Sequence, residues 1–160
     1  MKTLKALLAV MLVTLCLCGC QNETKQPQEP EIPTPFTEEE TMEAALEKTG
    51  LEFSIPYNFK PTVFLAYENG MVHLEQVNED ESKIYLRKAP VNPEMEDISG
   101  DYNSYEKTDK VTLVGQNVTV RMNGNKVHVA TWTDGDYSYA VGTTAGMSID
   151  ELIDFVEQIK

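Results

Sequence analysis

The sequence predicts an α+β domain, in which an antiparallel β-sheet of about six to seven strands carries an N-terminal and a C-terminal helix packed on one face. Two observations support this fold class. Seven segments in the middle of the chain alternate apolar and polar residues, a period typical of strands with one buried face. They are flanked by two segments whose apolar residues have helical spacing.

Both predicted helices begin with a capping-box pattern, in which a hydroxyl caps the third backbone amide and a glutamate reaches back. Residues 37–40 (TEEE) precede the first helix, and Gly50 is placed to end it. Residues 148–151 (SIDE) open the second helix, which continues over residues 152–159.

The predicted strands are separated by turn signals. The strongest is Asn123-Gly124, because this pair favours a two-residue hairpin. The pattern leaves open the order in which the strands pair. The expected strands are residues 62–67, 71–77, 83–88, 110–114, 117–122, 126–133 and 137–142.

The first 20 residues have the organisation of an export signal. Lys2 and Lys5 precede an apolar run over residues 6–17, which is shorter than the roughly 20 residues needed to span a bilayer. The run ends in Leu-Cys-Gly-Cys at residues 17–20, which resembles the lipobox of bacterial lipoproteins. The resemblance implies that residues 1–19 are a cleaved signal peptide and that Cys20 receives a diacylglycerol. An ordinary secretory leader or a single membrane anchor is the alternative.

A polar, proline-rich segment follows Cys20. It has prolines at positions 27, 30, 33 and 35, which remove amide donors and disfavour helix and sheet. We therefore expect the lipidated cysteine and a disordered tether over residues 20–36, and a single α+β extracytoplasmic domain over residues 37–160.

Charge and cysteine content exclude some classes of partner. The chain has 13 basic and 26 acidic residues, for a net charge of −13. Because nucleic acids are bound through Lys and Arg clusters, a nucleic-acid partner is not expected. All three cysteines lie within the first 20 residues, so the domain has no thiolates for a metal centre, and no cofactor is predicted.

The most site-like loop contains Asp97, Asp101 and Asn103. Two carboxylates and an amide are hard oxygen ligands suited to Ca²⁺, although their spacing does not match an EF-hand. The alternative is that these side chains cap turn amides, as Asp and Asn frequently do.

A second candidate site is the aromatic group of Trp132, Tyr137 and Tyr139. Exposed aromatic side chains in such a group form a stacking platform for sugars or peptide groups. The alternative, which we favour, is cross-strand packing that completes the core.

The sequence offers little that indicates catalysis. His73 and His128 lie in separate predicted strands without a third metal ligand nearby, so we interpret both as structural or surface histidines. The chain has no nucleophile elbow, phosphate-binding loop or His-Glu-Xaa-Xaa-His motif. We therefore do not expect an enzyme.

Much of the domain resembles a known family. The resemblance is carried by residues 50–56 (GLEFSIP), 84–88 (IYLRK), 96–105 (EDISGDYNSY), 129–141 (VATWTDGDYSYAV) and 147–159. These segments are similar to the family catalogued as domain of unknown function 4367, which occurs in Gram-positive lipoproteins. The resemblance implies an extracytoplasmic α+β module and supplies no catalytic residues.

Together these features predict a lipid-anchored module at the extracytoplasmic face of the cell membrane. Its expected partners are the membrane, through the anchor, and an envelope protein or small ligand that it binds without catalysis. Two other functions stay open. A deep acidic cleft would favour an envelope enzyme or its accessory, and an open apolar cavity between sheet and helices would favour a lipid or lipoprotein carrier.

Overall fold

A computed structural model of the chain describes residues 35–95 and 97–159. The predicted signal peptide, Cys20 and the part of the tether before Pro35 lie outside the described residues. Within the described ranges, none of the helices is long and apolar enough to cross a membrane.

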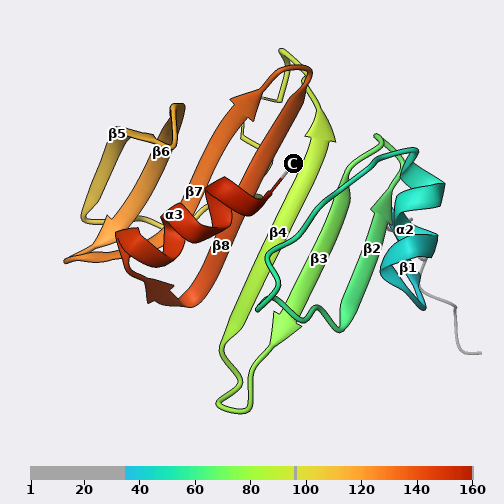
Figure 1. Cartoon of the computed structure of the whole chain (residues 1–160), viewed down its shortest axis with the longest axis horizontal. Helices are drawn as coiled ribbons and strands as arrows, with labels where there is room; N and C mark the ends of the chain where they lie inside the picture. The colour runs from blue at the N-terminus through green and yellow to red at the C-terminus, as the bar shows by residue number, and fades with distance from the viewer. Residues whose placement is uncertain (1–34, 96, 160) are drawn as a thin grey trace, which may run out of the picture. The chain divides into compact units, whose positions relative to one another are not determined.

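The described residues form an antiparallel sheet of eight strands (Figure 1). The strand order is β1-β2-β3-β4-β8-β7-β6-β5, so β1 and β5 form the two edges. The accompanying helices are α2 (Met42–Thr49) and α3 (Ile149–Gln158). The strands are β1 (Phe36–Glu39), β2 (Val63–Tyr67), β3 (Val72–Val77), β4 (Lys83–Pro90), β5 (Lys107–Leu113), β6 (Gln116–Asn123), β7 (Lys126–Asp134) and β8 (Tyr137–Met147).

The α+β class is confirmed, but the sheet has eight strands instead of the predicted six to seven, because the sequence pattern missed β1. Thr37 of β1 pairs with Ala66 of β2, so strand pairing satisfies the backbone that was expected to start a helix. Helix α2 begins later, where the hydroxyl of Thr41 accepts a hydrogen bond from the amide of Ala44 at 3.1 Å. Phe36, expected as the last residue of the tether, is the first residue of β1.

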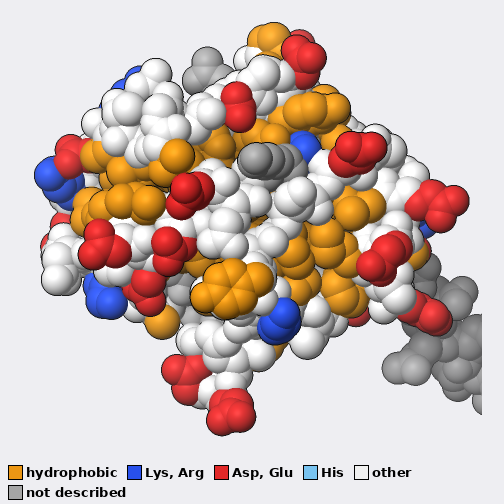
Figure 2. Space-filling model, viewed as in Figure 1, with side chains coloured by type: hydrophobic (Ala, Val, Ile, Leu, Met, Phe, Trp, Pro, Cys, Tyr) orange, Lys and Arg blue, Asp and Glu red, His pale blue; other side chains and the backbone are white. Residues whose placement is uncertain are grey.

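Both helices pack on one face of the sheet, as predicted. Helix α2 contacts β1, β2 and β3, whereas α3 contacts β7 and β8. Leu152 of α3 is fully buried in the same apolar cluster as Ala45 of α2, Leu74 of β3 and Leu86 of β4. Each fully buried leucine contributes about 1.5–3 kcal/mol. Figure 2 shows this face, on which apolar side chains also reach the surface between acidic ones.

A long connection covers part of the opposite face. Because β4 lies inside the sheet and β5 at its edge, the connection between them must cross β8, β7 and β6, and its described residues are 91–95 and 97–106. We call these residues the crossover segment. Its Ile98 is 3% exposed and packs against Ala89 of β4 and Ala140 of β8. The strands therefore bury side chains on both faces, whereas the alternation predicted a single buried face.

Candidate functional site

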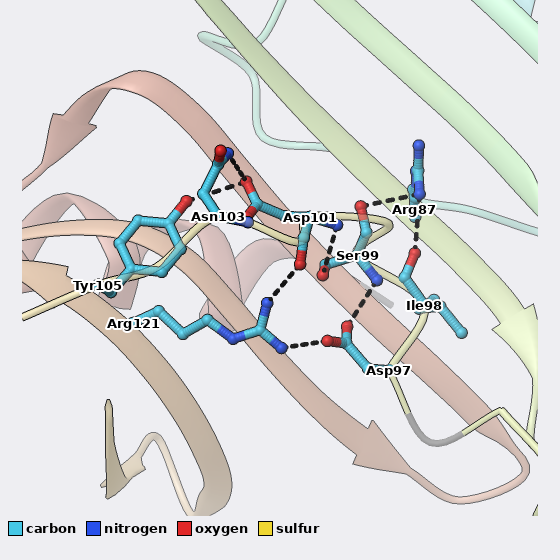
Figure 3. A network of polar contacts seen from close by, with 8 residues as sticks. All are labelled: Arg87, Asp97, Ile98, Ser99, Asp101, Asn103, Tyr105 and Arg121. Carbon is cyan, nitrogen blue, oxygen red and sulfur yellow. Dashed lines mark hydrogen bonds and ion pairs between the residues drawn. The ribbon is translucent and has the colours of Figure 1, made fainter. Parts of the chain in front are cut away.

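Arg87, in β4, fixes the crossover segment on the sheet (Figure 3). Its Nη1 atom donates hydrogen bonds to the carbonyl oxygens of Ile98 at 3.0 Å and Ser99 at 2.8 Å. Gly100 has a φ of 63°, and a Cβ atom there would lie 2.3 Å from Arg87 Nη1. The positive φ and the close approach of the guanidinium together favour glycine at position 100.

Arg121, in β6, holds the next part of the same segment (Figure 3). Its Nη1 atom donates to the carbonyl oxygen of Asp101 at 2.9 Å, and its Nη2 atom forms an ion pair with Asp97. The amide of Ser99 donates to Asp97 Oδ1 at 2.8 Å. Burial works to raise the pKa of Asp97, but the hydrogen bonds from Ser99 and Arg121 hold that pKa below its usual value.

The predicted Ca²⁺ ligands are occupied by these local contacts. Asp101 Oδ1 accepts from the amide of Asn103 at 2.9 Å, and Oδ2 accepts from the Tyr105 hydroxyl at 2.9 Å. Asp97 is directed to the Arg121 cation instead. Among the residues that the structure describes, no three His, Cys, Asp or Glu side chains are grouped as metal ligands. The geometry matches turn capping and gives the Ca²⁺ interpretation no support.

The predicted aromatic platform is not at the surface. Trp132 and Tyr139 are 6% and 5% exposed, and their rings stack with centroids 5.3 Å apart and planes 9° apart. They are direct partners on β7 and β8, the strands that α3 contacts, so they complete the core. Of the three residues, only Tyr137 is partly exposed. The burial of Trp132 and Tyr139 favours cross-strand packing, the interpretation preferred from the sequence, over an exposed platform.

Sequence reasoning missed Tyr85, which lies on the crossover side of β4. A Cβ atom on Gly142 of β8 would be 2.1 Å from Tyr85 Cζ, so the ring lies directly against that glycine. The Tyr85 hydroxyl is buried and has no hydrogen-bond partner in the described part of the chain. Burial raises the pKa of Tyr85 to about 12, which keeps this hydroxyl a neutral donor.

His73, in β3, connects Tyr85 to the arginine contacts. Its ring stacks on Tyr85 with centroids 5.5 Å apart. The Nε atom of Arg87 donates to His73 Nδ1 at 2.8 Å, which requires a neutral ring with a lone pair on that atom. Burial, followed by the charges of Arg87 and Lys83, lowers the pKa of His73 to about 3. His73 therefore has a structural role, in agreement with its interpretation from the sequence.

Tyr85 borders a polar cavity of about 300 Å³, lined by both the sheet and the crossover segment. We call it the crossover cavity. Tyr105 and His128 stack at its wall with centroids 5.7 Å apart, and His128 Nδ1 lies 3.2 Å from the carbonyl oxygen of Thr143. The complete lining is Tyr85, Asp101, Asn103, Ser104, Tyr105, Asn123, His128, Thr143 and Thr144.

No family model, curated protein or solved structure matches this chain. The resemblance to domain of unknown function 4367 therefore stays a prediction from the sequence. The crossover cavity and the two arginines that hold its wall in place are the features of the described residues that point to a function.

Proposed function

We propose that the chain is an extracytoplasmic lipoprotein, anchored to the cell membrane through Cys20, whose domain binds a small polar ligand in the crossover cavity without converting it. The lipobox-like sequence at residues 17–20 supports the anchor. One observation carries the binding function: Tyr85 lines a polar cavity, and its buried hydroxyl has no partner within the described residues.

The cost of an unpaired hydroxyl makes this observation informative. A buried donor without an acceptor costs about 1–3 kcal/mol, so native proteins place a side chain, a water or a ligand beside it. The crossover cavity is the space next to Tyr85 that can hold such a partner. Its volume of about 300 Å³ is at the lower end of small-molecule sites and suits a single sugar or amino acid.

The lining favours a ligand that is rich in acceptor oxygens. Asn123 Oδ1 accepts from the amide of Glu106, which leaves the Asn123 NH₂ group as a donor. Thr144 Oγ1 accepts from the amide of Lys83, which leaves the Thr144 hydroxyl hydrogen as a donor. Together with the Tyr85 hydroxyl, these side chains offer three donor groups. Because the chain has a net charge of −13, neutral hydroxyl and carbonyl groups are better matched to them than anions.

The same contacts favour binding over catalysis. A catalytic nucleophile needs a general base within hydrogen-bond reach. Asp101 is engaged by Tyr105 and Asn103, and His128 Nδ1 faces a backbone carbonyl oxygen. Within the described residues, neither the Asp101 carboxylate nor the His128 ring is hydrogen-bonded to a Ser or Thr hydroxyl.

The packing of the helices also favours a binding module over a lipid carrier. A carrier needs an open apolar space between sheet and helices. In the described residues Leu152 of α3, Leu74 of β3 and Leu86 of β4 are each 0% exposed and share one cluster. The helix side of the sheet is therefore a filled core over these strands.

Ligand binding is tested with the purified full-length lipoprotein in detergent, using thermal shifts and calorimetry with a panel of neutral sugars, short peptides and cell-wall fragments. We expect at least one member to bind, and Tyr85→Phe to bind it at least about tenfold more weakly, because a single hydrogen bond is lost. Tyr102→Phe is the matched control, since Tyr102 lies in the crossover segment but is 97% exposed. Equal affinities of wild type and Tyr85→Phe for every binder, or turnover of any of them, would refute the proposal.

The anchor is tested separately by mass spectrometry of the protein isolated from membranes. We expect an N-terminal peptide that begins at Cys20 and carries two acyl chains on the sulfur as a diacylglycerol thioether. A retained Met1 with an unmodified Cys20 would remove the anchor from the proposal without affecting the test of the cavity.

A further inference from the structure

Lys88, next to Arg87 in β4, is a buried cation on the opposite, helix-bearing side of the sheet. Its side chain packs with Nζ 4.4 Å from the ring centroid of Tyr137, 5.4 Å from that of Tyr139 and 5.7 Å from that of Phe53. The residue as a whole is 4% exposed. Aromatic faces stabilise an ammonium group but do not neutralise it.

The hydrogen-bonding capacity of Lys88 is only partly used. The ammonium has three donors, and one of them is given to the carbonyl oxygen of Glu52. Within the described residues, Lys88 forms no ion pair and donates no second hydrogen bond. Burial lowers the pKa of Lys88, and the charge of Glu52 opposes this effect without cancelling it, consistent with an ammonium that loses more from dehydration than it gains from that carboxylate. An incoming anionic group would supply the missing acceptor.

Lys88 and Tyr137 are part of the lining of a groove of about 520 Å³. The groove is formed by the β5–β6 turn, the β7–β8 turn and the last turn of α3, which lie toward the same end of the sheet (Figure 1). Val114, Val156 and Ile159 give it apolar walls. The face that carries α3 is the one in Figure 2, where apolar patches alternate with acidic side chains.

The turn residue Val114 is unusual in two respects. Its φ is 50°, a left-handed conformation that a β-branched residue adopts only under strain. Its apolar side chain is also 53% exposed at the groove. A Val–Gly turn in place of the common Asn–Gly turn therefore keeps a hydrophobic side chain at this site at the expense of backbone strain.

Three carboxylates share the groove with Lys88. Asp134 and Asp136 come from the β7–β8 turn and Glu157 from α3, and all three belong to exposed residues. None of them forms an ion pair with Lys88 or with any other described cation. The groove thus presents opposite charges that are both left unpaired, at its buried and its exposed parts respectively.

We infer that this groove is a second binding site, which takes a small zwitterion with an apolar side chain, such as a free amino acid or a short unblocked peptide. The carboxylate of the ligand accepts hydrogen bonds from Lys88, and its ammonium group lies among Asp134, Asp136 and Glu157. A purely anionic ligand is repelled by the three carboxylates, and a purely cationic ligand leaves the Lys88 ammonium without an acceptor. The apolar part of the ligand contacts the walls at Val114, Val156 and Ile159.

The probe is leucyl-leucine, compared with its N-acetylated form and its C-terminal amide, in calorimetric titrations of the full-length lipoprotein in detergent. We expect leucyl-leucine to bind and each blocked form to bind at least about tenfold more weakly, because each loses one charge-assisted contact. Failure of leucyl-leucine to bind, or equal affinity for the blocked forms, would overturn the inference.

Two substitutions locate the site. Lys88→Met keeps the length and apolar part of the side chain, and we expect it to lose about tenfold or more in affinity for leucyl-leucine. If Lys88→Met does not fold, Asp136→Asn tests the location of the site instead, because Asp136 is exposed. The matched control is Glu79→Gln, an exposed residue between β3 and β4 that changes the net charge by the same amount. Wild-type affinity in a folded Lys88→Met, or the same affinity in Asp136→Asn and Glu79→Gln, would overturn the inference.

Discussion

The neutral His73, which stacks on Tyr85, makes the stability of the domain depend on pH in a way that can be calculated. Burial and the neighbouring cations Arg87 and Lys83 lower the pKa of His73 from 6.5 to about 3. Glu75 Oε2 lies 3.8 Å from His73 Nε2 and would favour protonation, but Lys83 already pairs with Glu75 at 2.9 Å. The donor from Arg87 to His73 Nδ1 would also be lost if that atom took up a proton.

The direction of this pH dependence follows from comparing proton binding at His73 in the folded and unfolded states. Below pH 6.5 the unfolded chain binds a proton at His73, whereas the folded protein does not bind it until the pH approaches 3. The free energy of unfolding therefore falls as the pH is lowered through this window, by at most about 1.4 kcal/mol per pH unit. Between pH 7 and pH 5 the loss is about 2 kcal/mol, and it is nearly the same for any folded-state pKa below about 4.

The perturbation that isolates this effect is His73→Gln, because glutamine retains an acceptor for Arg87 but does not titrate. Urea denaturation of both proteins at several pH values gives the free energy of unfolding. Between pH 7 and pH 5, we expect the free energy of unfolding of the wild type to fall by about 2 kcal/mol more than that of the variant. Titrations of carboxylates are common to both proteins and cancel in this difference. Parallel pH profiles would show that His73 is protonated in the folded state, and the burial argument would be refuted.

Three further substitutions test the packing. Gly142→Ala places a Cβ atom 2.1 Å from Tyr85 Cζ, and we expect a loss of about 1–3 kcal/mol in urea denaturation, whereas wild-type stability would mean that the ring can move away freely. Leu152→Ala truncates a side chain that is 0% exposed, and a loss of about 2–5 kcal/mol is expected; a loss below 1 kcal/mol would contradict the role of α3 in the core. Ser148→Ala removes the cap of α3 and is expected to cost about 1 kcal/mol in the same assay, an effect that should vanish if the capping box does not form.

Features that depend on a few neighbouring residues were predictable from the sequence. Gly50 ends α2 with a φ of 69°, and Gly124 turns the β6–β7 hairpin with a φ of 57°. Ser148 and Glu151 form the complete capping box at α3. In each case the hydrogen bonds that stabilise the backbone conformation close within a few residues, so a short pattern can indicate it.

Features that depend on distant partners were not predictable. Residues 37–40 satisfy the capping-box pattern as well as residues 148–151 do, yet Thr37 is a strand residue because Ala66 offers it a pairing partner. The carboxylate of Asp97 is a suitable ligand for a cation, but it is paired with Arg121, which is 24 residues away in the sequence. Local sequence did not indicate either partner, since both depend on the order of the strands.

The crossover cavity was missed for a related reason. Period-two alternation in β4 does place Tyr85 on the side opposite Leu86, so an aromatic residue on the non-core face of a strand was a usable signal. What the pattern cannot supply is the crossover segment that covers this residue. The position of β4 inside the sheet, with β5 at its edge, requires that segment to cross the strands between them, and its residues Asp101 and Tyr105 line the cavity together with Tyr85.

The crossover cavity and the groove both depend on β4, through its two consecutive cations Arg87 and Lys88. Because side chains alternate along a strand, Arg87 serves the crossover side and Lys88 the helix side, so a shift of β4 by one residue would exchange them. Both side chains donate hydrogen bonds to backbone carbonyl oxygens. Arg87 donates to those of Ile98 and Ser99, and Lys88 donates to that of Glu52. Carbonyl oxygens do not titrate, so mild acid leaves both attachments intact. The pH dependence that we calculate for His73 therefore reflects the burial of its ring beside Tyr85 rather than release of the segments that cover the sheet.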